Sequence, residues 1–112
     1  MCLLQVATDV FPWTEDRAVW PECPTFPAID MAIPAQKLLF QVTVSLKHKL
    51  HVRGMVSHLN NVGATAENKA KLIVLTRKAE FRSMTAMPFT DKGNTDMDAF
   101  TERFEQWVAY IK

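Results

Sequence analysis

The chain has 112 residues, of which 48% are hydrophobic, and its 13 Lys and Arg residues against 12 Asp and Glu give a formal net charge of +1. This length suits one domain with one core, and the composition excludes a disordered chain. The near-neutral charge excludes a uniformly basic nucleic-acid-binding protein, and no apolar stretch is long enough to span a bilayer.

The N-terminal part is predicted to be irregular. Residues 1–10 favour a short strand, and residues 11–27 hold four prolines interleaved with aromatic residues. Prolines at this density exclude a helix and favour an extended, loop-like course. The first residues also lack the basic leader of a signal peptide and meet Asp9 at once. We therefore expect a single domain over 1–112 that begins with an irregular segment, 1–27.

Two strands joined by a turn come next. Residues 28–33, AIDMAI, are a strand stopped by Pro34, and residues 38–46 alternate between apolar and polar side chains. The polar face of 38–46 carries amide and hydroxyl groups rather than charges, which indicates a role other than simple solvation. A turn over 34–37 makes the two strands a hairpin and places Asp30 opposite the stretch from about Leu39 to Gln41.

Two further elements follow the hairpin. Residues 49–62 change to a helical period, and Gly63 is a natural residue for the left-handed position after a helix. Residues 71–76, KLIVLT, form a short continuous apolar run, which fits a strand buried on both faces. Residues 80–87 are a further strand or an irregular loop, and residues 91–94, DKGN, are a turn.

A second helix is predicted over 95–111. Thr95 followed by Asp98 resembles a capping box, and apolar residues then recur at helical spacing. These residues are Met97, Phe100, Phe104, Trp107, Val108 and Ile111. The whole order of elements predicts a small α/β domain in which helices flank a mixed sheet.

Asp30 is the first candidate for chemistry, because it is the one charged residue in PAIDMAIP. Burial of a lone carboxylate is costly unless it is paired or holds a metal. With the Gln41 amide and a backbone carbonyl on the adjacent strand, it offers the oxygen ligands that magnesium prefers. The alternative is that Asp30 accepts hydrogen bonds from a nearby loop.

Charge is distributed unevenly, because no acid lies between Asp30 and Glu67. That interval holds a cluster that we expect to contact the phosphates of a nucleic acid. Its members are Lys47, His48, Lys49 and Arg53. Two alternatives are a solvated helix entry and a zinc site formed by His48, His51 and His58.

The hairpin resembles the core signature of Crinkler-type effectors and the related retrotransposon hot spot proteins. The pattern is FPxID, a short turn, and an apolar pair leading to QxTxSxxH and a further apolar residue. It is carried by Phe26, Pro27, Ile29, Asp30, Leu39, Phe40, Gln41, Thr43, Ser45, His48 and Leu50. The resemblance covers about residues 20–112 and implies a restriction-endonuclease-like core. In this family that core often follows a P-loop NTPase domain, and because these 112 residues hold no such domain we expect a truncated or stand-alone copy.

The same resemblance implies a site and a setting. Asp30 and Gln41 match the two magnesium ligands, and Thr43 stands where the fold keeps a catalytic lysine. The implied protein is a secreted effector that acts in a host nucleus and binds or cleaves DNA with magnesium. The alternatives are a catalytically inactive module that binds nucleic acid or a host protein, and a decayed gene copy.

Overall fold

The computed structural model describes residues 16–19, 29–43 and 45–111. Its elements, in chain order, are β1 (Met31–Ile33), the 3-10 helix η1 (Pro34–Gln36), β2 (Leu38–Val42), β3 (Leu50–His51), α2 (Val52–Val62), β4 (Ala70–Arg77), α3 (Lys78–Phe81), β5 (Phe89–Thr90), α4 (Met97–Thr101) and β6 (Phe104–Ile111). The predictions for residues 1–10 and for most of 11–27 lie outside the described residues.

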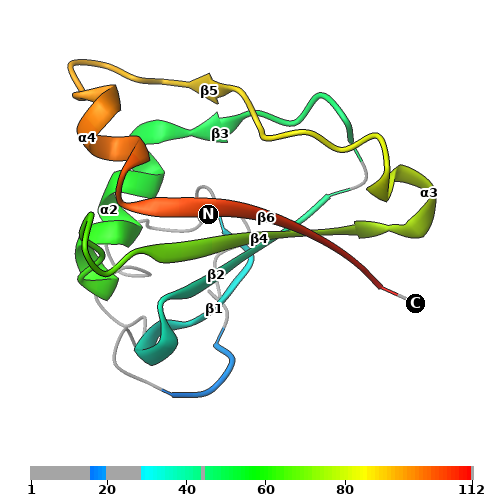
Figure 1. The fold of residues 1–112 in the computed structure, drawn as a ribbon, viewed down its shortest axis with the longest axis horizontal. Coiled ribbons are helices and arrows are strands. Elements are labelled where there is room, and N and C mark those ends of the chain that lie inside the picture. Colours follow the sequence, from blue (N-terminus) through cyan, green and yellow to red (C-terminus); the bar gives the residue numbers. More distant parts are fainter. Residues whose placement is uncertain (1–15, 20–28, 44, 112) are drawn as a thin grey trace, which may run out of the picture.

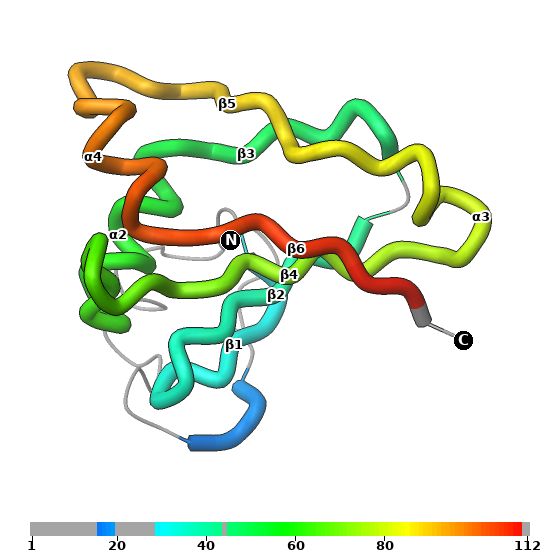
Figure 2. Tube along the Cα trace, in the orientation of Figure 1, coloured from blue at the N-terminus to red at the C-terminus, as the bar shows by residue number. Residues whose placement is uncertain are grey.

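The centre of the fold is a mixed sheet of four strands in the order β1-β2-β4-β6 (Figure 1). β1 is antiparallel to β2, whereas β2, β4 and β6 run parallel to one another. A short parallel ribbon of β3 and β5 lies beside the sheet (Figure 2). The predicted class, α/β with a mixed sheet and flanking helices, is confirmed at this level.

The predicted hairpin of β1 and β2 is present, although β1 begins at Met31, so Ile29 and Asp30 of the strand predicted over 28–33 precede it. Met31 lies opposite Phe40 and Ile33 opposite Leu38, and η1 makes the turn with Lys37 in the left-handed conformation, at φ 55°. β2 ends at Val42 rather than at residue 46. The reason is local: the Thr43 hydroxyl accepts a hydrogen bond from the Ser45 N–H at 3.0 Å, and the Ser45 hydroxyl accepts one from the Lys47 N–H at 3.2 Å.

Burial along β4 shows that the sheet has one buried and one open face. Ala70, Leu72, Val74 and Thr76 are buried, whereas Ile73 and Leu75 between them are only half-buried. The prediction that 71–76 is buried on both faces is therefore wrong. On the open face Val42 is 53% exposed and Trp107 is 51% exposed. The apolar even positions of β2 thus face outward, and Leu39, Gln41 and Thr43 share the side that carries the core.

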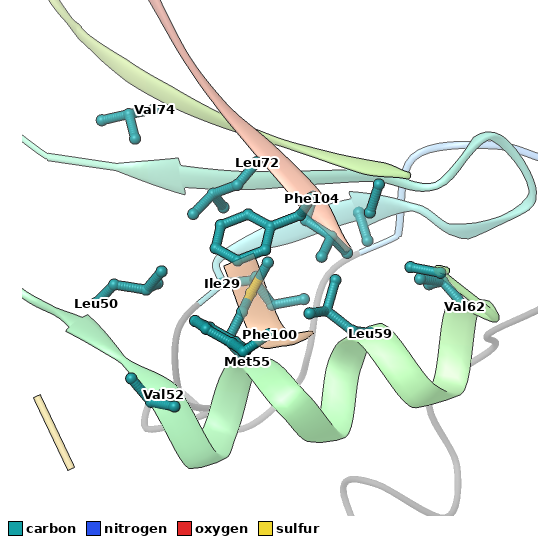
Figure 3. Packing of buried hydrophobic residues seen from close by; sticks show 14 of the residues in the cluster. Ile29, Leu50, Val52, Met55, Leu59, Val62, Leu72, Val74, Phe100 and Phe104 are labelled. Carbon is teal, nitrogen blue, oxygen red and sulfur yellow. The ribbon is translucent and has the colours of Figure 1, made fainter. Parts of the chain in front are cut away.

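Helix α2 begins later than predicted, because residues 50 and 51 pair with β5 instead. His51 is the N-cap, and its Nδ1 accepts a hydrogen bond from the Gly54 N–H at 3.1 Å. The predicted stop is confirmed: Gly63 has φ 72° and donates its N–H to carbonyls of the last turn. Val52, Met55 and Leu59 are fully buried and point from α2 toward the sheet (Figure 3).

The prediction of a helix over 95–111 is wrong. Helix α4 covers only Met97–Thr101, and the chain then forms β6, which pairs with β4 over its eight residues. The N-cap is Asp96, whose carboxylate accepts a hydrogen bond from the Ala99 N–H at 3.3 Å, rather than Thr95. Aromatic and β-branched residues give FEQWVAYI a preference for a strand, and the ladder along β4 satisfies its backbone groups.

The core lies between α2 and the buried face of the sheet, and α4 closes one end (Figures 1 and 3). Three aromatic rings pack edge to face there: Phe100 lies 5.6 Å from Phe89 and 5.0 Å from Phe104 between ring centroids. The prediction of an irregular loop over 80–87 is confirmed only from residue 82, because residues 80 and 81 belong to α3. The predicted turn over 91–94 includes a hydrogen bond from the Thr95 N–H to the Lys92 carbonyl at 3.1 Å.

Candidate functional site

The hairpin brings Asp30 and Gln41 together. The antiparallel register that pairs Met31 with Phe40, continued by one position, places Asp30 opposite Gln41. The Asp30 N–H donates a hydrogen bond to the Phe40 carbonyl at 2.7 Å. Residues opposite each other in an antiparallel pair point to the same face. The Gln41 Nε2 group donates to Asp30 Oδ2 at 3.1 Å, and the Val42 N–H donates to the same oxygen at 2.8 Å.

These contacts leave two oxygen atoms of the pair available. Neither Asp30 Oδ1 nor Gln41 Oε1 takes part in a hydrogen bond with the part of the chain that the structure describes. The alternative prediction for Asp30, local hydrogen bonding, therefore holds for one of its oxygens, although the donors come from β2 rather than from a loop. The other carboxylate oxygen and the amide oxygen are of the type that hard cations prefer as ligands.

The donor set fits magnesium only in an open form. Within residues 16–19, 29–43 and 45–111, no group of three His, Cys, Asp or Glu side chains could hold a metal. One carboxylate and one amide oxygen would have to be completed by water and by oxygens of a substrate, which is how magnesium commonly binds at phosphate-processing sites. Asp30 is exposed and Gln41 is half-buried, so solvent and substrate can reach them.

Thr43 follows Gln41 by two positions and belongs to the same face of the sheet. Thr43 is half-buried, its hydroxyl accepts the Ser45 N–H, and it carries no positive charge with which to assist the attack of water. A second hydroxyl, which the sequence did not single out, belongs to the neighbouring strand. Thr76 is 3% exposed, and its Oγ1 has no hydrogen-bond partner among the described atoms.

The predicted phosphate-contacting cluster is divided between two places. Lys47 and Lys49 are exposed and His48 is half-buried in the connection from β2 to β3. Arg53 belongs to α2 instead, and its guanidinium forms an ion pair with Asp91 at the end of β5. The positive charge of Arg53 is thus compensated, whereas no ion pair of the two lysines occurs among the residues that the structure describes.

Asp91 also contacts His51, with 2.8 Å between Asp91 Oδ2 and His51 Nε2. The hydrogen bond from Arg53 keeps the pKa of Asp91 below its ordinary value, and the positive charge of Arg53 acts in the same direction. Both nitrogens of His51 are occupied, and His48, His51 and His58 do not form a metal-binding group. The alternative of a zinc site on these three histidines is therefore wrong.

Replacement of Asp91 by Asn tests how much the Asp91 charge contributes to stability through its contacts with Arg53 and His51. The residue has φ 57°, and Asn tolerates that left-handed conformation, so the change isolates the charge. Because the pKa of Asp91 is lower in the folded chain than in the unfolded chain, its stabilising contribution is present above the unfolded pKa and is lost as the pH falls through the folded pKa. We expect urea unfolding to show a less stable Asp91→Asn at neutral pH and a difference that disappears in acid. A difference that did not change with pH would contradict this account.

Comparisons with models of protein families, with curated proteins and with solved structures found no match for this chain. In the described part of the chain, no helix is both long enough and apolar enough to cross a membrane.

Proposed function

We propose that this chain is a nuclease-like domain that binds duplex DNA at the edge of the sheet where Asp30 and Gln41 meet, with a divalent metal held by these two residues. The observation that carries the proposal is the 3.1 Å contact between the Gln41 amide and the Asp30 carboxylate across the hairpin. The resemblance to Crinkler-type effectors requires these two residues on one face of two neighbouring strands.

In this proposal different residues bind the metal, orient the carboxylate and bind the phosphates. Asp30 Oδ1 and Gln41 Oε1 hold the metal, while the Val42 N–H and the Gln41 Nε2 group fix the orientation of the carboxylate. Lys47 and Lys49 bind the phosphate backbone next to it. The chemistry that a divalent ion supplies at such a site is polarisation of a phosphodiester oxygen and activation of water.

The alternative function is a catalytically inactive module of the same kind that binds nucleic acid or a host protein. Two observations favour it: among the described residues Asp30 is the carboxylate that contacts Gln41, and Thr43 stands where a lysine would help the attack of water. Binding of DNA is common to the first function and to the nucleic-acid form of the second. The secreted setting and the host nucleus stay part of the proposal, on the strength of the resemblance alone.

The affinity for duplex DNA, measured with magnesium and with a chelator, tests the proposed function. We expect magnesium to strengthen binding by wild type about 5- to 150-fold, the usual range of coupling between two ligands, and to have no effect on Asp30→Asn. Asp16→Asn is the matched control, since Asp16 is an exposed carboxylate that accepts a hydrogen bond from a Gln side chain, Gln36, at 2.8 Å. Equal magnesium dependence in all three proteins would overturn the metal site.

A further inference from the structure

Two connections of the chain leave the sheet at the same edge. β2 and β4 are parallel, so the segments that follow them, 43–49 and 78–88, both start at the carboxyl ends of the strands. The parallel pairing of β3 with β5 then brings the ends of the two segments together, and the Leu50 N–H donates to the Pro88 carbonyl at 2.8 Å. Both segments lie at the α3 end of the molecule (Figures 1 and 2).

The second segment is held firmly against the sheet. The Phe81 ring at the end of α3 packs edge to face on Tyr110 of β6, with 4.8 Å between centroids. Further along, the Gln106 side chain accepts the Met87 N–H at 2.8 Å, and Met87 is buried. The segment therefore contacts β6 at two points, with Lys78 three positions before the first contact and Arg82 directly after it.

This anchored segment presents positive charge. Arg77 is paired with Glu80, which raises the pKa of Arg77 and lowers that of Glu80 through their hydrogen bond, so the two charges compensate each other. Lys78 and Arg82 are exposed, and neither forms an ion pair within the described residues. Together with Lys47 and Lys49 they make four positive charges that form no ion pair with a described residue, in the segments that follow the carboxyl ends of β2 and β4.

We propose that Lys78 and Arg82 form a second phosphate-contacting segment, which acts together with Lys47 and Lys49 on the backbone of one duplex DNA. The inference rests on the proposed function, because it extends the same DNA-binding edge. The carboxyl edge of parallel strands is where open α/β sheets usually bind their ligands. Exposed cations that no acid neutralises are suited to the release of counterions from DNA phosphates.

Salt dependence of duplex DNA binding is the readout, because each phosphate contact contributes about −0.9 to the slope of log affinity against log salt concentration. We expect Lys78→Ala with Arg82→Ala to make the slope of wild type shallower by about 1.8, the value for two contacts. Lys47→Ala with Lys49→Ala should have an effect of the same size. Circular dichroism and the unfolding midpoint establish that each variant is folded.

The matched control removes the same charge from the other end of the fold. Lys69 precedes β4 and Lys92 lies in the connection from β5 to α4, and both are exposed. If only Lys47→Ala with Lys49→Ala changes the slope beyond the Lys69→Ala, Lys92→Ala control, the second segment is wrong and the proposed function stands. If only the Lys78, Arg82 variant does so, the second segment is supported and the assignment of Lys47 and Lys49 is overturned. Absence of DNA binding by wild type, or equal slopes in all variants, would overturn both proposals.

Discussion

Leu72→Ala is expected to lower the free energy of unfolding by about 3 kcal/mol, within the range measured for Leu to Ala changes in packed cores. Leu72 belongs to the central strand β4, is completely buried, and points toward α2 beside Phe104 and Met55 (Figure 3). Truncation at this position leaves a cavity between the sheet and α2. The neighbouring side chains can fill it only in part, because they are held by a rigid strand. Urea unfolding of the purified protein measures the effect.

Leu75→Ala is the matched control for this prediction. Leu75 lies on the same strand but on the open face of the sheet, where it is half-buried. The smaller area that it removes from water should limit the loss to about 1 kcal/mol. A loss at Leu75 equal to or larger than the loss at Leu72 would mean that the buried face of the sheet has been assigned to the wrong side.

The second large effect is expected for Thr43→Lys. Thr43 follows Gln41 by two positions on the face of the sheet that carries the candidate site, and the residue is half-buried. A lysine there would place a positive charge beside the attacked phosphate, and electrostatic or acid–base help of this kind is worth about 10²–10⁴-fold in rate. We therefore expect faster metal-dependent nicking of duplex DNA by Thr43→Lys than by wild type.

Two controls make this experiment decisive. The gain must disappear in the double variant Thr43→Lys with Asp30→Asn, because the metal ligand is then lost. Ser45→Lys adds the same charge to the same connection, but at a position two residues further from Gln41. An equal gain in Ser45→Lys would attribute the effect to general attraction of DNA. No metal-dependent nicking by folded Thr43→Lys would leave the inactive binding module as the better account.

The hairpin and the end of α2 could be predicted because short-range features determine them. Alternation and Pro34 fix the strands and the turn, which together place Asp30 opposite Gln41, and Gly63 supplies the left-handed conformation at the helix end. These features lie within a few residues of the structure that they specify. The central pair of the candidate site was therefore accessible from the sequence.

The C-terminal element could not be predicted in this way, because its apolar residues fit two periods. Phe100, Phe104, Trp107 and Val108 recur at helical spacing, yet Phe104 and Val108 also lie on one face of a strand. The choice is made by β4, whose register with β6 runs from Ala70 and Phe104 to Arg77 and Ile111. The backbone hydrogen-bond partners of β6 lie about 34 positions away in sequence, and local propensity contains no information about such distant partners.

The arrangement of charges around the site could not be predicted either, because it also depends on strands that are distant in sequence. Arg53 and Asp91 are 38 positions apart and meet only because β3 pairs with β5, so the sequence left Arg53 in the phosphate-contacting cluster. Lys78 and Arg82 had no visible relation to Lys47 and Lys49 until the parallel strands brought their connections to one edge. Spacing along the chain carries little information about charge clusters that are assembled by sheet topology.

Binding of Mn²⁺, followed through the paramagnetic broadening of backbone amide resonances, tests the central claim most directly. If Asp30 and Gln41 hold a divalent metal, the amides of Asp30, Gln41 and Val42 should broaden first in wild type and in Asp16→Asn. The same amides should remain sharp in Asp30→Asn. Broadening centred on Asp96 and Asp98 at the start of α4, or unchanged broadening in Asp30→Asn, would contradict a metal site on this hairpin.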